Sequence, residues 1–124
     1  FVTLGNTKPQ RDFNYIDDVV DAFIIVLKNK KIFGKVINVG SNKKISVLEL
    51  FKKISKITKK NKKLKISVER KRPQASEVDN LQCNNKKILK ITKWRPKTKL
   101  KEGLLNTVKW FKNKSISDTK EYII

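Results

Sequence analysis

The residues of this chain best suited to bind a ligand are its few arginines. The chain contains 27 Lys but only 4 Arg, so a position that keeps Arg is informative. Arg11 stands before Asp12, and Arg72 stands before Pro73. A planar guanidinium group can bind two phosphate oxygens at once, which a Lys ammonium group cannot do. One interpretation is a pyrophosphate clamp built from Arg11 and Arg72; the alternative is a structural ion pair at each arginine.

Other catalytic chemistry is poorly represented in the sequence. There is no His for a His-based triad, and Cys83 lacks such an activating base, so we predict a structural role for it. Glu77 lies five residues after Arg72, where its carboxylate could accept hydrogen bonds from a base or a sugar. Glycine occurs only at positions 5, 34, 40 and 103, which excludes a dinucleotide fingerprint and a P-loop.

The Asp-rich stretch at positions 17 to 21 is predicted to begin a helix rather than to bind a metal. Either Asp17 or Asp18 could supply the N-cap oxygen, and a negative charge is favourable at a helix N-terminus. The chain is therefore expected to hold no catalytic residue, no cofactor-binding residue and no metal site of its own.

These residues need elements to position them, and hydrophobic periodicity predicts both helices and strands. The helices are expected at 18–29, at 47–58 behind a Ser46/Glu49 capping box, around 88–91, and at 99–113. Strands are expected at 36–39 and 64–68, after an extended segment at 1–16. The class is α/β. Because the strands are too few for a free-standing sheet, the first helix and the 36–39 strand are expected to be covered by further protein.

The composition is strongly basic, with 31 Lys and Arg against 11 Asp and Glu and a net charge of +20. A basic nucleic-acid-binding module is one possible interpretation. However, Lys, Ile and Asn make up 52 of the 124 residues, and their A/T-rich codons favour a base-composition bias. We therefore expect no specific nucleic-acid partner.

No apolar run reaches the roughly 20 residues of a membrane span, so no membrane partner is expected, and the single Cys fits a cytoplasmic location. The chain has no Met, so it is expected to be part of a longer protein.

Four stretches resemble the C-terminal part of extended short-chain dehydrogenase/reductase enzymes, the NAD-dependent nucleotide-sugar epimerases and dehydratases. They are RDFNYIDD from Arg11, VINVGS from Val36, RPQASEV from Arg72, and the closing segment from Trp94 to Phe111. The third stretch is most similar to the 4,6-dehydratase branch, including dehydratases that feed legionaminic-acid synthesis. The resemblance implies a nucleotide-sugar-binding portion at 1–113, followed by a tail at 114–124. It also implies a Rossmann-type enzyme whose N-terminal half, absent here, binds NAD.

The resemblance also implies roles for individual residues. Arg11 and Arg72 match arginines that contact the nucleotide diphosphate, and Glu77 matches a carboxylate that helps to hold the base. Asn38 ends the strand beside the substrate, although a structural role in the turn is as well supported. The implied parent is a homodimeric lyase of cell-surface polysaccharide biosynthesis. It would move a hydride from sugar C4 to NAD, remove water across C5–C6, and return the hydride to C6.

The implied substrate is a nucleotide-diphosphate sugar, either a GDP- or a UDP-linked N-acetylhexosamine. This chain would hold the diphosphate and would be inactive alone. A 4-epimerase or reductase on the same scaffold is the alternative within the family.

Overall fold

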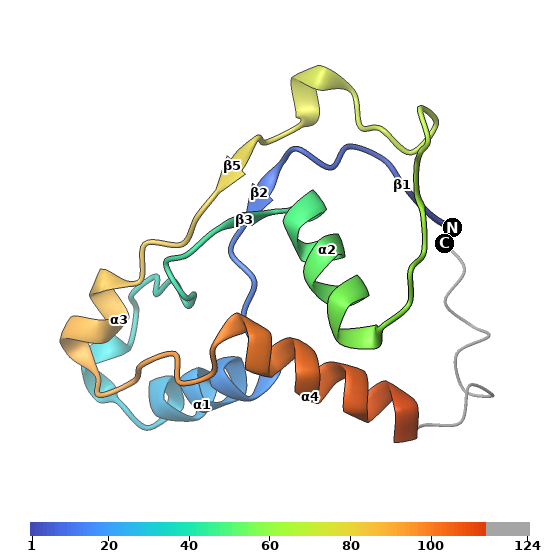
Figure 1. Cartoon of the computed structure of the whole chain (residues 1–124). Coiled ribbons are helices and arrows are strands. Elements are labelled where there is room, and N and C mark those ends of the chain that lie inside the picture. The colour runs from blue at the N-terminus through green and yellow to red at the C-terminus, as the bar shows by residue number, and fades with distance from the viewer. Residues whose placement is uncertain (114–124) are drawn as a thin grey trace.

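The computed structural model describes residues 1–113 and shows a mixed α/β chain, which confirms the predicted class (Figure 1). The helices are α1 (Ile16–Leu27), α2 (Val47–Thr58), α3 (Lys86–Ile91) and α4 (Leu100–Asn113), with short 3-10 turns at Lys30–Ile32 and Gln74–Ser76. The strands are β1 (Val2–Leu4), β2 (Gln10–Arg11), β3 (Ile45–Ser46), β4 (Leu64–Ile66) and β5 (Asn80–Leu81). The tail predicted at 114–124 lies outside the described residues.

The strands form two small sheets. In the first, β1 pairs with β4 in parallel, with Val2 opposite Leu64. In the second, β2 is the central strand, antiparallel to β3 and parallel to β5. Arg11 therefore lies between Ile45 and Leu81. This central position fixes the backbone of Arg11 on both sides.

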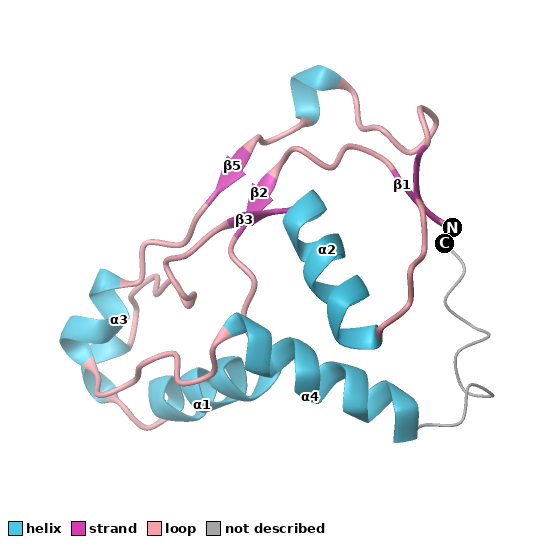
Figure 2. Ribbon diagram, viewed as in Figure 1, coloured by secondary structure: helices cyan, strands magenta, loops and turns pink. Residues whose placement is uncertain are grey.

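The four predicted helices are present, with α2 packed against α4 and α4 crossing the start of α1 (Figure 2). The Ser46/Glu49 capping box is confirmed: the Ser46 hydroxyl accepts from the Glu49 N–H at 3.1 Å, and Glu49 Oε2 accepts from the Ser46 N–H at 2.9 Å. The Ser46 N–H and the Ser46 hydroxyl both donate to Glu49 Oε2, and these two hydrogen bonds lower the pKa of the Glu49 carboxyl.

The predicted N-cap of the first helix is wrong. The cap residue of α1 is Tyr15, which makes no side-chain cap, and Asp17 and Asp18 lie inside the first turn. Their charges still suit the helix N-terminus. The Asp18 carboxylate is instead used by a distant part of the chain, because it accepts hydrogen bonds from the backbone that leads into α4.

The strand predicted at 36–39 is also not formed. A strand needs a hydrogen-bonded neighbour, and none of the five strands between residues 1 and 113 pairs with this segment. Ile37 and Val39 pack against the core, while the Val36 side chain is 81% exposed. The segment is therefore an apolar, extended run without a ladder partner.

The hydrophobic core lies where α1, α3 and the turn after α3 meet. Ala22, Ile88 and Trp94 form its buried centre, and partly buried side chains of α1 and of the 36–39 segment pack against them. The Trp94 indole N–H donates to the Asp18 carbonyl oxygen at 2.9 Å, which satisfies its polar atom inside this core. In the described part of the chain, no helix has the length and apolar character needed to cross a membrane.

Candidate functional site

Arg11 occupies the centre of the candidate site and is held by three acceptors. Its Nη1 donates to the carbonyl oxygens of Val78 at 2.6 Å and Gln10 at 2.9 Å. Its Nη2 lies 3.1 Å from Glu77 Oε1, and both side chains of this ion pair are largely buried. These contacts join the central strand β2 to the loop at 72–79, which stands more than sixty residues later in the chain. The structural alternative from the sequence, an ion pair at Arg11, is thus observed.

Glu77 contacts Arg11, and it also borders a cavity that contains Arg72. This cavity has a volume of about 280 Å³ and is lined by Asn6, Lys71, Arg72, Glu77 and Asp79. The structure therefore brings two predicted site residues, Arg72 and Glu77, to one cavity. Glu77 also pairs with a third predicted site residue, Arg11. The roles predicted for Arg72 with a diphosphate and for Glu77 with a base stay predictions.

Asn38, the fourth predicted site residue, is near Arg11. Both residues line a second cavity of about 490 Å³, between the 36–39 segment and the chain after β5. Arg11 and Arg72 border different cavities, and Glu77, which pairs with Arg11, lines the cavity that contains Arg72.

A third cavity beside Arg11 carries positive charge from residues that the sequence did not single out. It has a volume of about 480 Å³, and its lining includes Arg11, Lys43, Lys97 and Lys99 but no carboxylate. Because lysines occur throughout this chain, their number alone could not have marked these three. Only the approach of β3 and the start of α4 to β2 places them together.

The start of the loop that carries Arg72 is anchored to the backbone of residues 3 and 5. Arg70 Nη1 donates to the Thr3 carbonyl oxygen at 3.2 Å. The Gly5 backbone lies so close to the Arg70 carbonyl that a Cβ at position 5 would collide with it. This explains why the turn before β2 uses glycine, and it fixes the loop against the first sheet.

Asp12, next to Arg11, is a positioning residue that sequence reasoning missed. Its carboxylate accepts hydrogen bonds from the Ser41 N–H at 3.1 Å, the Ser41 hydroxyl at 2.6 Å and the Asn42 N–H at 2.9 Å. It also accepts from the Cys83 N–H at 3.3 Å. One side chain thus fastens the turn after residue 39 and the segment after β5 to β2. Its place beside Arg11 in the RDFNYIDD stretch was the available signal.

Cys83 lies beside this carboxylate and packs directly on Gly40, where a Cβ would collide with it. Burial, followed by the negative charge of Asp12, raises the pKa of the Cys83 thiol. The thiolate is the reactive form, so a raised pKa disfavours nucleophilic chemistry at this residue.

We expect iodoacetamide to alkylate Cys83 several-fold more slowly in the folded chain than in the same chain unfolded in urea, at pH 8. A thiol whose pKa is raised in the folded state holds less thiolate at this pH, and its reaction rate should still be rising above pH 9. Mass spectrometry of timed, quenched samples measures both rates. Equal alkylation rates in the folded and unfolded states would contradict a raised pKa of the Cys83 thiol.

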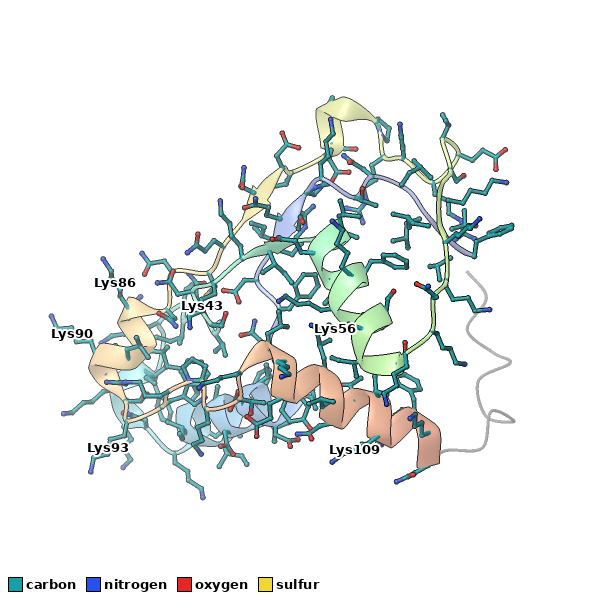
Figure 3. All side chains as sticks on the ribbon, viewed as in Figure 1. Lys43, Lys56, Lys86, Lys90, Lys93 and Lys109 are labelled. Atoms are coloured by element: carbon teal, nitrogen blue, oxygen red, sulfur yellow. The ribbon has the colours of Figure 1, made fainter. Side chains whose placement is uncertain are left out.

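One further feature limits the chemistry of the described residues. Between residues 1 and 113 no group of three or more Cys, Asp or Glu side chains is placed to hold a metal ion. Figure 3 shows the labelled lysines on several elements, with Lys86 and Lys90 on α3, Lys56 on α2 and Lys109 on α4. The labelled lysines are thus spread over separate elements.

Comparison with known proteins gives consistent similarities. The family model described as GDP-mannose 4,6 dehydratase matches residues 1–107. The dTDP-D-glucose 4,6-dehydratase of Bos taurus is 34% identical over 87% of this chain and 31% of its own length. The crystal structure of the UDP-glucose 4-epimerase from Thermotoga maritima with UDP-glucose matches with a TM-score of 0.78 and 29% identity, over 90% of this chain and 34% of that chain.

A further solved structure, the dTDP-glucose 4,6-dehydratase from Bacillus anthracis str. Ames in complex with NAD, matches with a TM-score of 0.76 and 25% identity. It covers 89% of this chain and 34% of that chain. The chain thus spans about a third of the length of the relatives it matches.

Proposed function

Since this chain belongs to the NAD-dependent epimerase/dehydratase family of short-chain dehydrogenases/reductases, we propose that it is the nucleotide-sugar-binding portion of a 4,6-dehydratase. The proposed substrate is a GDP- or UDP-linked N-acetylhexosamine. The proposal takes residues 1–113 as this portion and places the enzyme in the cytoplasm as a homodimer, a lyase of polysaccharide biosynthesis.

The observation that carries the proposal is the contact of Arg11 with the Arg72 loop. The partly buried Arg11–Glu77 pair draws that loop onto the central strand, so two arginines far apart in sequence flank one carboxylate. The Arg11 guanidinium has five N–H donors, and its three observed acceptors leave two for the oxygens of a ligand. We infer that these two donors meet the diphosphate, with Arg72 approaching from the other side of Glu77.

The described residues lack the glycine-rich loop that binds the diphosphate of NAD in dinucleotide-binding domains. The four glycines are too far apart in sequence to form a phosphate-cradling loop. We therefore propose that NAD is bound by protein outside this chain. What this chain does in the reaction is to bind and orient the nucleotide sugar. On this proposal, the chain alone forms no 4-keto sugar from UDP- or GDP-N-acetylglucosamine in the presence of NAD, and detection of that product would refute it.

Replacing Arg11 or Arg72 with Lys is expected to weaken binding of UDP- and GDP-N-acetylglucosamine by about tenfold each. Lys keeps the positive charge but loses the second, parallel hydrogen bond, a change of about 1.4 kcal/mol in binding free energy. Isothermal titration of the purified chain with each nucleotide sugar measures the effect.

The matched control is Arg95→Lys. Among the described residues, Arg95 donates to the carbonyl oxygens of Leu89 and Trp94, and it lines none of the three cavities around Arg11 and Arg72. Its replacement should leave the affinity unchanged. Equal losses in all three variants would indicate a general charge effect, and no binding by the natural chain would count against the proposed function itself.

A 4-epimerase or a reductase of the same family is the second candidate. The similarity to the Thermotoga maritima UDP-glucose 4-epimerase favours the epimerase at least as strongly as the similarity to solved dehydratases favours a dehydratase. Product analysis of the complete enzyme with UDP- and GDP-N-acetylglucosamine separates the reactions, because a dehydratase accumulates a 4-keto-6-deoxy product and an epimerase does not. Tight DNA binding at physiological salt, without any response to nucleotide sugar, would favour the nucleic-acid alternative instead.

A further inference from the structure

An apolar groove lies between strand β1 and helix α2, and we call it the α2 groove. It has a volume of about 360 Å³, which is within the range of small-molecule sites. Its apolar lining comes from both elements: Val2, Leu4, Val47, Leu50, Phe51 and Ile54. The lining is completed by four polar side chains: Ser55, Thr58, Lys60 and Lys62.

The walls of the α2 groove are incompletely covered. The apolar residues of α2 repeat at helical spacing, as in a helix that packs one face on a core. Yet no α2 side chain is fully buried in the described part of the chain, and Ile54 in the groove is 36% exposed. On the opposite wall, Val2 is 37% exposed. Apolar surface is thus left over that a ligand with an apolar body would cover.

The polar residues of the groove lie at one of its ends. Beyond the last turn of α2, the Val2 N–H donates to the carbonyl oxygen of Lys63 at 2.8 Å. At the start of α2, the Leu48 N–H donates to the carbonyl oxygen of Thr7 at 3.0 Å. Strand and helix therefore run in opposite directions, and the polar lining at positions 58–62 lies beside Val2, where the helix ends.

This polar end carries positive charge without a matching acid. Within residues 1–113, the ammonium groups of Lys60 and Lys62 have no ion-pair partner. The sequence from 50 to 68 contains eight Lys and no Asp or Glu, and no carboxylate lines the groove. The local charge therefore favours an anionic head group at this end and disfavours a cationic one.

The length of the groove limits the chain that it can hold. From Val47 to Thr58, helix α2 rises by about 16 Å, at about 1.5 Å per residue. With C–C bonds of about 1.5 Å, an extended chain of about twelve carbons spans about 14 Å. Such a chain can lie along α2 with its head group at the two lysines.

We propose that the α2 groove binds the anion of a free medium-chain fatty acid of about ten to twelve carbons. The carboxylate lies at the Lys60 and Lys62 ammonium groups, and the acyl chain lies along Leu50, Phe51 and Ile54. Each CH2 group that the groove removes from water adds to the affinity. The inference uses no residue assigned to the nucleotide sugar, so it does not rest on the proposed function.

The test titrates dodecanoate into the purified chain, below the concentration at which dodecanoate forms micelles. Isothermal titration should show one saturable site. Octanoate should bind at least about tenfold more weakly, because its shorter chain covers less apolar surface. Dodecyltrimethylammonium, which has the same chain and the opposite charge, should also bind at least about tenfold more weakly. No nucleotide sugar is present, so the result is independent of the proposed clamp.

The double variant Lys60→Gln/Lys62→Gln should weaken dodecanoate binding about fivefold, because the carboxylate loses both charges. Both side chains are exposed, so circular dichroism should be unchanged. The matched control is Lys86→Gln/Lys90→Gln on α3, which removes the same charge away from the groove and should leave the affinity unchanged (Figure 3). Ile54→Gln tests the apolar wall and should weaken binding about tenfold.

Nuclear magnetic resonance locates the bound chain. The methyl signals of Leu4, Leu50 and Ile54 should shift when dodecanoate is added, because these side chains line the groove. The methyl signals of Ile24 should not shift, although this α1 residue is also exposed, at 44%. Equal shifts at Ile24 would mean that dodecanoate adsorbs to any apolar surface, and would overturn the proposal.

Four further results would overturn it. These are no saturable binding of dodecanoate, equal affinity for dodecyltrimethylammonium, an affinity insensitive to both groove variants, and a dimer of the chain that Ile54→Gln abolishes. The dimer would assign the groove to a second copy. Binding to phosphatidylglycerol vesicles that Ile54→Gln abolishes, without binding of free dodecanoate, would assign it to a membrane surface instead.

Discussion

Replacement of Asp12 with Ala is expected to lower the free energy of unfolding of this chain by about 4 kcal/mol, because several donors lose a charged acceptor at once. The Asp12 carboxylate accepts from the N–H groups of Ser41, Asn42 and Cys83 and from the Ser41 hydroxyl. These donors come from two segments, the turn after residue 39 and the segment after β5. A loss of this size is a large part of the stability of a small domain, so the variant should unfold at a much lower urea concentration than the natural chain.

Urea unfolding followed by circular dichroism at pH 7 measures this change. Asp12→Asn should retain part of the stability, because an amide oxygen still accepts hydrogen bonds while its NH2 group faces other donors. Asp79→Asn is the matched control, since Asp79 is exposed and the Gln10 N–H donates to its backbone carbonyl oxygen, which this change retains. If Asp12→Ala unfolded at the same urea concentration as the control, the carboxylate would not hold the two segments.

Replacement of Asp18 with Ala is expected to lower the free energy of unfolding by about 3 kcal/mol, because two backbone N–H groups lose a buried charged acceptor. Asp18 is 5% exposed. Its Oδ1 accepts from the Lys97 N–H at 3.1 Å, and its Oδ2 accepts from the Thr98 N–H at 2.9 Å. These bonds fix the turn that leads into α4 against the start of α1, so the variant should loosen the packing of these two helices.

The neighbouring carboxylate provides the control for this second change. Asp17 is exposed in the same helical turn, and Asp17→Ala should cost only about 0.5 kcal/mol through its interaction with the helix dipole. Thermal and urea unfolding of both variants compares the two positions. Similar destabilisation by both would mean that Asp18 acts through the helix dipole and not through the turn before α4.

Together these two carboxylates explain why an Asp-rich motif stands beside the candidate site. Neither is placed as a catalytic group. Asp12 holds the turn and the segment that border the cavity shared by Arg11 and Asn38. Asp18 holds the entry to α4, whose first residue borders the positively charged cavity on the other side of Arg11. The motif therefore positions the walls around Arg11, while Glu77 and the Val78 carbonyl orient Arg11 itself.

Several predictions from sequence were confirmed because they depend on short-range order. The apolar spacing of α2 and the Ser46/Glu49 pair define a helix and its cap within a few residues, so the capping box could be recognised directly. The family was recognisable for a similar reason, since its motifs are contiguous stretches such as RDFNYIDD. The prediction of an Asp N-cap for α1 was wrong because a carboxylate at a helix start can accept hydrogen bonds in two ways. It can accept from the N–H groups of its own helix or from those of a distant segment, and the sequence does not distinguish the two.

By itself, the sequence of this chain determined the α/β class, the positions of its four helices, its family and the set of candidate residues. Only the tertiary structure decided that Glu77 pairs with Arg11, that Asp12 and Asp18 fasten distant segments, and that 36–39 has no strand partner. The physical reason is range: helix periodicity and capping act over one or two turns, whereas ion pairs, strand ladders and buried acceptors depend on segments that meet only when the chain has folded.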